Sequence, residues 1–331
     1  MTDAAARWIE RMLAGDRLAL AKLMTLVENR EPDAAEVMSL LHERAAATRI
    51  IGITGPPGAG KSTLADRLVA ALRNDGRRVG VVAVDPSSPF SGGAVLGDRI
   101  RMQGHFLDAG VFIRSLSARG RVGGLARAAR DVARLLGAFD CDAVLVETVG
   151  VGQNEFDIMR LADTVVVVLV PEAGDAIQAM KAGLLEIADV FVVNKADRDG
   201  AARMRHELEV MLHLRPQRAW TVPVLSTVAL DGRGVAELLQ ALDAHRDHLA
   251  HSGDGAARAA AARHEEFVGA VRDELGRRLE RALNDGELRE LMAAVERGDI
   301  DPYGALQKVF ADGGRIAQAM VREPGRDVVA P

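Results

Sequence analysis

One glycine-rich segment constrains this chain more than any other feature, the nine residues Gly55-Pro-Pro-Gly-Ala-Gly-Lys-Ser-Thr63. It matches the pattern G-x-x-x-x-G-K-[ST] at every fixed position, and it lies between an apolar run ending at Thr54 and a helical pattern over 64–72. Its glycines let the backbone close around phosphate oxygens, toward which successive N–H groups and the helix N-terminus point. Lys61 adds a positive charge near the β- and γ-phosphates, and Ser62 offers a hydroxyl to Mg²⁺. The complete motif and its flanks disfavour the alternative, a strand-to-helix turn without a ligand. The predicted phosphate-binding residues are Gly55, Pro56, Pro57, Gly58, Ala59, Gly60, Lys61, Ser62 and Thr63.

Composition sets the class of protein in which this segment lies. The 331 residues suffice for about two domains, and hydrophobic residues make up 48% while aromatic ones make up 3%, so the core must rest on aliphatic side chains. The net charge of −5 argues against a general nucleic-acid-binding protein. The single cysteine, Cys141, allows no disulfide within the chain and is expected to be buried. With no signal peptide at the N-terminus and no apolar run of about 20 residues, we expect a cytoplasmic protein without a membrane partner.

The pattern along the chain predicts three parts. Residues 1–48 read as a helical N-terminal extension, with helices over 6–12, 18–28 and 33–47 that begin near Asp16 and Asp33 as N-caps. Residues 49–250 alternate apolar strands with helices, which predicts an α/β domain with a mostly parallel, doubly wound sheet. Residues 251–331 read as a glycine- and alanine-rich joint followed by helices over 258–283, 286–297 and 302–310. The expected strands are 50–54, 79–84, 111–115, 143–147, 164–169, 190–194 and 222–226.

A second motif indicates which base the site holds. Asn194-Lys-Ala-Asp197 matches N-K-x-D directly after an expected strand. The Asp197 carboxylate can accept hydrogen bonds from the N1–H and the exocyclic amine of guanine, whereas adenine lacks that N1–H. Asn194 and Lys195 would brace the loop, the lysine stem packing on the base. The alternative is a polar helix cap, but the position after a strand and downstream of the phosphate loop favours guanine recognition.

Three carboxylates at expected strand or loop ends are candidates for a magnesium shell, because Mg²⁺ prefers oxygen ligands. Asp85 and Glu147 close strands, and Asp98 lies in a glycine-containing loop; together with Ser62 they form the predicted metal site. Each carboxylate could instead cap a turn or a helix.

Two glycine-rich segments, 86–93 and 148–154, have the composition of switch loops that respond to the γ-phosphate. Gly150 could donate its N–H to that phosphate, so the predicted catalytic residues are Lys61, Asp98, Glu147 and Gly150. Ordinary loop composition is the alternative. The basic loop Arg119–Gly124 has no role that chemistry alone assigns.

Taken together, three long segments resemble the MeaB/ArgK/MMAA family of P-loop GTPases of the SIMIBI class. They are 86–99, 147–155 and 194–197, and the likeness extends over nearly the whole chain, including 298–303. The resemblance implies a chaperone of adenosylcobalamin-dependent methylmalonyl-CoA mutase that binds GTP, GDP and Mg²⁺. It also implies that Gly174–Lys181 is a further mobile segment that signals to the mutase, and that the C-terminal helices are a dimerisation arm of a homodimer.

One segment departs from the family pattern. Where the family has Ser-Ala-Leu around the base, this chain has Val228-Ala-Leu230, so backbone N–H groups of Ala229 and Leu230 remain to meet the guanine O6. No base for the attacking water lies in the phosphate loop, so we expect slow intrinsic hydrolysis that a partner raises. Two alternatives stay open: a P-loop kinase of the LAO/AO transport type, and a nickel metallochaperone GTPase, for which one cysteine and eight scattered histidines are few ligands.

Overall fold

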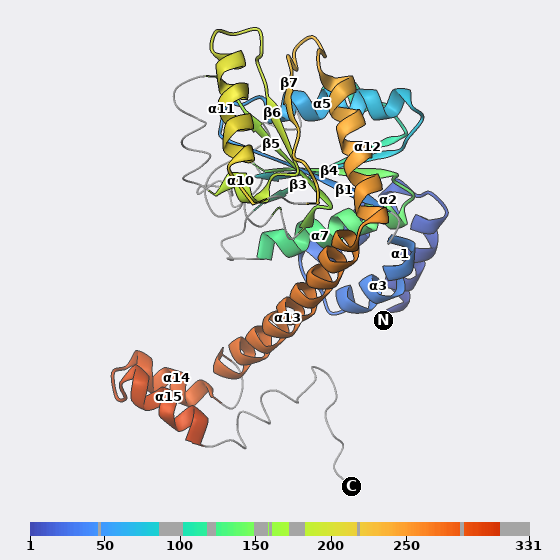
Figure 1. The fold of residues 1–331 in the computed structure, drawn as a ribbon. Coiled ribbons are helices and arrows are strands. Elements are labelled where there is room, and N and C mark those ends of the chain that lie inside the picture. Colours follow the sequence, from blue (N-terminus) through green and yellow to red (C-terminus); the bar gives the residue numbers. More distant parts are fainter. Residues whose placement is uncertain are drawn as a thin grey trace. The chain divides into compact units, whose positions relative to one another are not determined.

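The computed structural model describes residues 1–45, 48–85, 102–117, 124–148, 158, 161–171, 183–216, 219–284 and 288–311 (Figure 1). The side chains of Asp85, Gln103, Ser117 and 124–126 are outside that description. Contacts divide the chain into two units, Met1–Arg258 and Ala259–Pro331. The division of the chain into the three predicted domains therefore stays a prediction.

The first unit is built on one parallel sheet of seven strands. Their order is β3-β2-β4-β1-β5-β6-β7, and every pairing between neighbours is parallel. This confirms the predicted doubly wound α/β fold. All seven strands therefore end at the same edge of the sheet, with β1 between β4 and β5. The strands are β1 Arg49–Thr54, β2 Val79–Asp85, β3 Val111–Ser117, β4 Ala143–Thr148, β5 Thr164–Leu169, β6 Val190–Val193 and β7 Val224–Ser226.

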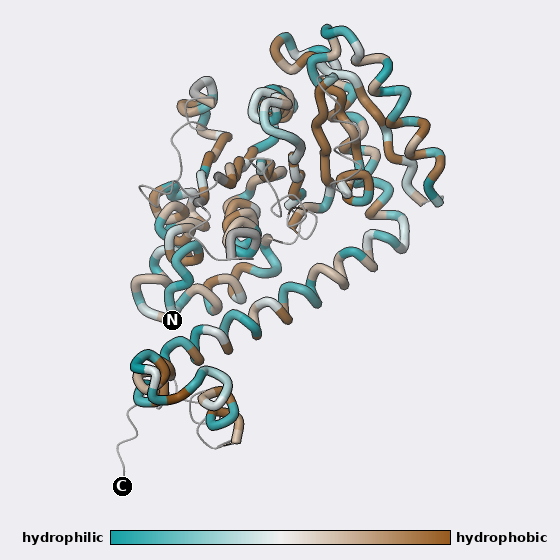
Figure 2. Tube along the Cα trace, turned by 90° about the vertical axis from the view of Figure 1, so that its left-hand side faces the viewer, coloured by the Kyte–Doolittle hydropathy of each residue, from teal (hydrophilic) through white to brown (hydrophobic). Residues whose placement is uncertain are grey.

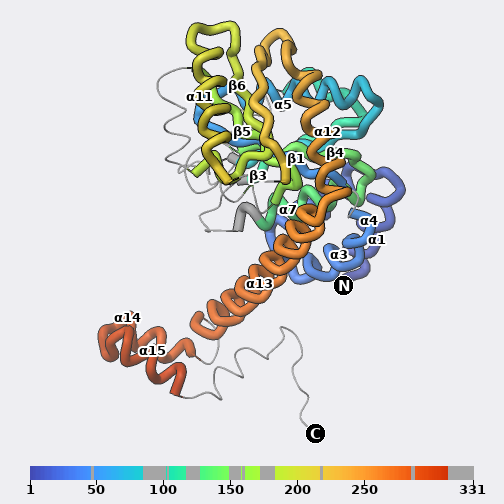
Figure 3. Tube along the Cα trace, in the orientation of Figure 1, coloured from blue at the N-terminus to red at the C-terminus, as the bar shows by residue number. Residues whose placement is uncertain are grey.

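Helices cover both faces of the sheet because alternate residues of each buried strand point to opposite sides. On one face, Ile51 and Ile53 of β1 pack in a cluster with α5 (Lys61–Asn74) and α12 (Val235–His251), which lie beside each other (Figure 3). On the other face, Val165 and Val167 of β5 pack with α10 (Leu184–Ile187) and α11 (Ala201–His213). A short 3₁₀ helix, η1, spans Gln103–His105.

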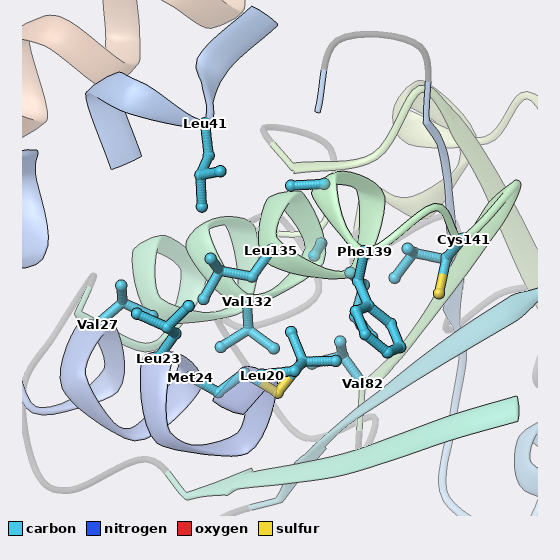
Figure 4. Packing of buried hydrophobic residues seen from close by; sticks show 14 of the residues in the cluster. Leu20, Leu23, Met24, Val27, Leu41, Val82, Val132, Leu135, Phe139 and Cys141 are labelled. Carbon is cyan, nitrogen blue, oxygen red and sulfur yellow. The ribbon is translucent and has the colours of Figure 1, made fainter. Parts of the chain in front are cut away.

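The N-terminal helices are packed onto the sheet unit through α7 (Gly124–Ala138). Figure 4 shows Leu20 and Leu23 of α2 facing Val132 and Leu135 of α7, in a cluster that also holds the predicted buried Cys141. Burial raises the pKa of the Cys141 thiol to about 12, so this cysteine is protonated at neutral pH and unreactive. These helices are α1 Asp3–Leu13, α2 Arg17–Glu28, α3 Ala34–Leu40 and α4 His42–Ala45.

The two predicted N-caps have different outcomes. Asp16 accepts hydrogen bonds from the N–H groups of Leu18 and Ala19 and caps α2, as predicted. Asp33 makes no capping bond to α3; it accepts instead from the N–H and hydroxyl of Thr2. The single helix expected over 33–47 is also wrong, because α3 ends at Leu40 and α4 begins at His42.

The second unit contains most of α13 (Gly253–Asn284), together with α14 (Arg289–Glu296) and α15 (Pro302–Ala311). The joint predicted at 251–257 is largely helical, since α13 begins at Gly253 and alanines after it favour the helix. Figure 2 shows hydrophobic and hydrophilic residues mixed along α13. None of the described helices is long and apolar enough to cross a lipid bilayer.

A buried histidine of α12 contacts the N-terminal ends of β5 and β6, at the sheet edge opposite the phosphate loop. His245 is fully buried; its Nδ1 lies 2.9 Å from the Thr164 hydroxyl, and its Nε2 lies 3.4 Å from Asp189 Oδ1. The Asp189 carboxylate also binds the Arg258 guanidinium and the Val165 N–H. Burial lowers the pKa of His245 to about 4, and the positive charges of Arg258, His248 and Arg49 act in the same direction while Asp189 opposes them.

This shift predicts an acid sensitivity of folding. The unfolded chain takes up a proton at His245 below about pH 6.5 while the folded chain stays neutral, so the free energy of unfolding falls as pH falls toward 4. The expected slope from this group is about 1.4 kcal/mol per pH unit. We expect the free energy of unfolding, measured in urea between pH 6.5 and 5, to fall less steeply with decreasing pH in His245→Gln than in the wild type. His206→Gln, at an exposed histidine of α11, should keep the wild-type slope. Equal slopes in the two variants would contradict the prediction.

Candidate functional site

The predicted phosphate loop connects β1 to α5 at the carboxyl edge of the sheet, where ligands bind in parallel α/β folds. Gly55 has φ 139°, and a Cβ there would lie 2.0 Å from the carbonyl oxygen of Val168 in β5, so only glycine fits. Gly58 and Gly60 have φ 77° and 87°. These values turn the chain sharply into α5, and the helix N-terminus thus opens toward the loop.

Lys61 and Ser62 occupy the first turn of α5 and are both buried. The Lys61 ammonium lies inside the loop, 2.9 Å from the carbonyl oxygen of Gly55 and 3.0 Å from that of Pro56. The positive charge is therefore positioned within the loop that would surround a phosphate group. Backbone carbonyls hold it there through hydrogen bonds that a phosphate oxygen can replace.

Glu147, near the end of β4, meets Ser62 across the sheet edge. The Ser62 hydroxyl donates to Glu147 Oε1 at 2.5 Å, and both side chains are buried. Beside them the hydroxyls of Thr54 and Thr148, at the ends of β1 and β4, lie 3.0 Å apart. A hydroxyl and a carboxylate oxygen in contact are hard ligands of the type that Mg²⁺ binds. The structure thus brings together two of the four residues predicted for the metal.

The other predicted metal and catalytic residues lie outside the described part of the chain. Asp98 and Gly150 are among the residues without a described placement, and Asp85 has a described backbone in β2 but no described side chain. The predicted switch segment 86–93, the predicted switch segment 148–154 beyond Thr148, residues 119–123 of the basic loop and the segment Gly174–Lys181 also lie outside the described residues. Within the described ranges, no group of three or more histidine, cysteine or acidic residues could hold a metal ion.

Asn194 links the phosphate loop to the predicted base-binding loops. Its Nδ2 donates to the Ala59 carbonyl at 2.8 Å, and its Oδ1 accepts from the Thr227 hydroxyl and from the Ala229 N–H at 3.0 and 3.1 Å. A Cβ at Gly60 would lie 2.4 Å from the same Nδ2, so a close approach of loop and amide requires glycine there too. Three hydrogen bonds thus support the predicted bracing role of Asn194.

The rest of the predicted base-binding motif includes a solvent-exposed carboxylate. Lys195 has φ 56°, which turns the chain after β6, and Asp197 is exposed two residues later. Val228 is buried, and its N–H donates to the Arg233 carbonyl, so a short backbone bridge joins these two residues of the loop. The N–H of Ala229 donates to Asn194, while that of Leu230 has no acceptor among the described residues.

The sequence analysis gave no individual role to four residues around the site. Thr54, Thr148 and Thr227 are buried hydroxyls at strand ends, and Arg67 of α5 donates to the carbonyl oxygens of Ala229 and Leu230. A polar residue closing an apolar strand is a signal that could have identified the three threonines. For Arg67 the sequence holds no such signal, because its acceptors are backbone atoms more than 160 positions away.

Comparisons with known proteins agree with this geometry. The family model described as Methylmalonyl Co-A mutase-associated GTPase MeaB matches residues 20–284. The "Putative GTPase" of Pyrococcus abyssi (strain GE5 / Orsay) is 47% identical over 315 residues, which are 93% of this chain and 97% of that protein. The Mus musculus protein "Methylmalonic aciduria type A homolog, mitochondrial" is 34% identical over 281 residues, 78% of this chain and 68% of the other. The crystal structure of LAO/AO transport system kinase has a TM-score of 0.66 and 29% identity, covering 94% of this chain and 98% of its own.

Proposed function

The chain belongs to the MeaB family of methylmalonyl-CoA mutase-associated GTPases, and on that premise we propose that it is a GTP-hydrolysing chaperone of a mutase. Its client would be adenosylcobalamin-dependent methylmalonyl-CoA mutase or a related acyl-CoA mutase. The observation that carries the nucleotide part is the buried contact of Ser62 with Glu147 beside Lys61, at the same sheet edge as the Asn194 bridge.

Each residue of that edge has a role in the proposal. The backbone N–H groups of Gly58 and Gly60 and the N-terminus of α5 would point at the phosphates, and Lys61 would neutralise charge on the β- and γ-oxygens. Asp197 would accept from the N1–H and amine of guanine. Asn194 would keep the phosphate loop and the base loop at a constant separation, since it binds both.

Magnesium fits the described donors of the site. Ser62 and Glu147 would hold the ion, directly or through water, with Asp85 and Asp98 as further proposed ligands. Bound there, Mg²⁺ would offset the negative charge of the β- and γ-phosphates. Asp98, Glu147 and Gly150 stay the proposed residues that respond to the γ-phosphate. Slow intrinsic hydrolysis in the absence of a partner also stays part of this proposal.

The proposal is tested by measuring GTP hydrolysis with and without a purified methylmalonyl-CoA mutase. We expect free phosphate to form slowly from GTP alone and faster once the mutase is added, with much weaker binding of ATP. An unchanged rate together with no co-migration of the two proteins would contradict the chaperone role. Transfer of the γ-phosphate to an amino acid or protein acceptor would instead support the kinase alternative, and tight stoichiometric nickel would support the metallochaperone.

We also propose that the second unit pairs with a second copy of the chain. Among its described residues only Ala282, Leu288 and Ala305 are buried apolar side chains, and Leu283 and Val309 are packed against the first two. So small a core cannot stabilise the unit by itself. Four large apolar residues of α13 recur at intervals of four and are 38–70% exposed, namely Phe267, Val271, Leu275 and Leu279. Because such spacing places them along one side of the helix, this apolar stripe is a suitable surface for self-association.

A charge in the middle of the apolar stripe should separate the dimer. Leu275→Glu is expected to yield monomers at micromolar concentration, because pairing would bury an uncompensated carboxylate. Ala262→Glu adds the same charge about 140° away from Leu275 around α13 and should leave the dimer intact. Light scattering after size exclusion gives the mass of each. A wild-type monomer, or a dimeric Leu275→Glu, would refute the pairing.

A further inference from the structure

An arginine outside the predicted nucleotide-binding set holds the loop 228–230. Arg67 lies on α5, six residues beyond Lys61, and is exposed overall. Its Nε donates to the Ala229 carbonyl oxygen at 3.1 Å, and its Nη2 donates to the Leu230 carbonyl oxygen at 2.6 Å. Two successive carbonyls therefore point at one planar guanidinium, whose donors are arranged to bind such a pair.

This double contact also orients an N–H group. In a trans peptide unit the C=O and the following N–H point in opposite directions, and the described chain has no cis peptide. Because Arg67 holds the Ala229 carbonyl, the N–H of Leu230 is directed away from the guanidinium. The other two N–H groups of the loop already donate, that of Val228 to Arg233 and that of Ala229 to Asn194. Leu230 is left as the loop's available donor among the described residues.

We propose that Arg67 is a positioning residue for recognition of 6-oxopurine nucleotides, holding the Leu230 N–H as a donor to the purine O6. This inference rests on the proposed guanine-nucleotide function and adds a specificity determinant to it. Adenine carries an amine at the same position, so a fixed N–H would face another donor and disfavour it. Since Arg67 and Lys61 lie on one helix, α5 would join the phosphate end of the site to the base end.

The test measures how strongly Arg67 is coupled to atom 6 of the base. Full-length wild type, Arg67→Met and Arg73→Met are titrated with GDP, 6-thio-GDP and inosine diphosphate. The sulfur of 6-thio-GDP is a poor acceptor but keeps the N1–H and amine, whereas inosine diphosphate keeps O6 and lacks the amine. Arg73 is a matched control: it lies on the same helix and pairs with Asp108 instead of the base loop.

In Arg67→Met we expect GDP affinity to fall about fivefold to tenfold, as for the loss of one ordinary hydrogen bond. Affinity for 6-thio-GDP should change little. The ratio of the affinity for GDP to the affinity for 6-thio-GDP should therefore shrink by the same factor. That ratio reports on atom 6, whereas inosine diphosphate reports on the amine. The affinity lost when the amine is absent should equal the wild-type loss, because in the proposal Asp197 accepts the hydrogen bond from that amine. In Arg73→Met, the affinities for 6-thio-GDP and inosine diphosphate relative to GDP should both equal the wild-type values. Arg67→Gln, which retains a donor, should fall between wild type and Arg67→Met.

Equal losses for GDP and 6-thio-GDP in Arg67→Met would overturn the inference, since a general structural or charge effect does not distinguish oxygen from sulfur. That result would leave the proposed GTPase function standing. Equal affinity of the wild type for GDP and ADP is a separate failure, because it would remove the base-specific site itself and the inference with it.

Discussion

Lys61→Ala is expected to lower the affinity for GDP and GTP by about 10- to 100-fold, the range for losing one charged hydrogen-bonding partner. Hydrolysis should fall further, because charge that develops on the phosphate oxygens would lose its nearest fixed cation. The structure supports so large an effect, since the ammonium is buried and held inside the loop by the Gly55 and Pro56 carbonyls. Calorimetry with GDP and release of phosphate from GTP measure the two quantities.

A matched control separates this local effect from the loss of one positive charge. Lys22→Ala removes an exposed lysine of α2 and should bind and hydrolyse GTP as the wild type does. Thermal unfolding of both variants shows whether Lys61→Ala remains folded. A folded Lys61→Ala protein with unchanged nucleotide affinity would refute the phosphate assignment of the whole loop.

Asp197→Asn is expected to change the base that the site prefers. The carboxylate offers two acceptors to the N1–H and amine of guanine, and losing both charged bonds should weaken GDP binding on the order of 10²- to 10⁴-fold. The asparagine amide instead offers one acceptor and one donor, which suits xanthine, whose C2 carries an oxygen. Binding of xanthosine diphosphate should therefore strengthen. Competition between GDP and xanthosine diphosphate measures the switch.

Asp199→Asn provides the control, because Asp199 is an exposed neighbour on the same turn after β6. It should leave the preference for GDP unchanged. If Asp197→Asn bound GDP as tightly as the wild type, Asp197 would not be the residue that reads guanine, although the phosphate loop could still be correct.

The strands were predictable because their signal is local. Thr164–Leu169 is β5 to the residue, since a run of Val and Leu covered on both faces has few other structures available. The last strand begins at Val224 instead of the predicted Val222. Pro223 lies between these positions and has no N–H to donate to a neighbouring strand. The separation of α3 from α4 carried no such local signal.

The order of the strands was beyond the reach of sequence patterns. β4 is inserted between β2 and β1, and this brings Glu147 next to the loop that follows β1. A continuous apolar run identifies a buried strand but is the same whichever neighbours that strand has. The pairing of Ser62 with Glu147 was therefore expected only because ligands in such folds meet at strand ends.

Residue types at a fixed spacing were enough to predict the phosphate-binding loop of this protein. Gly55, Gly60, Lys61 and Ser62 act within one short stretch of backbone, so their geometry follows from the loop itself. Tertiary structure alone decided how the base loop is held, because Asn194 reaches Ala59 across 135 positions and Arg67 reaches Ala229 across 162. Contacts over such distances depend on how strands and helices pack, and only the folded chain brings these groups within hydrogen-bonding range.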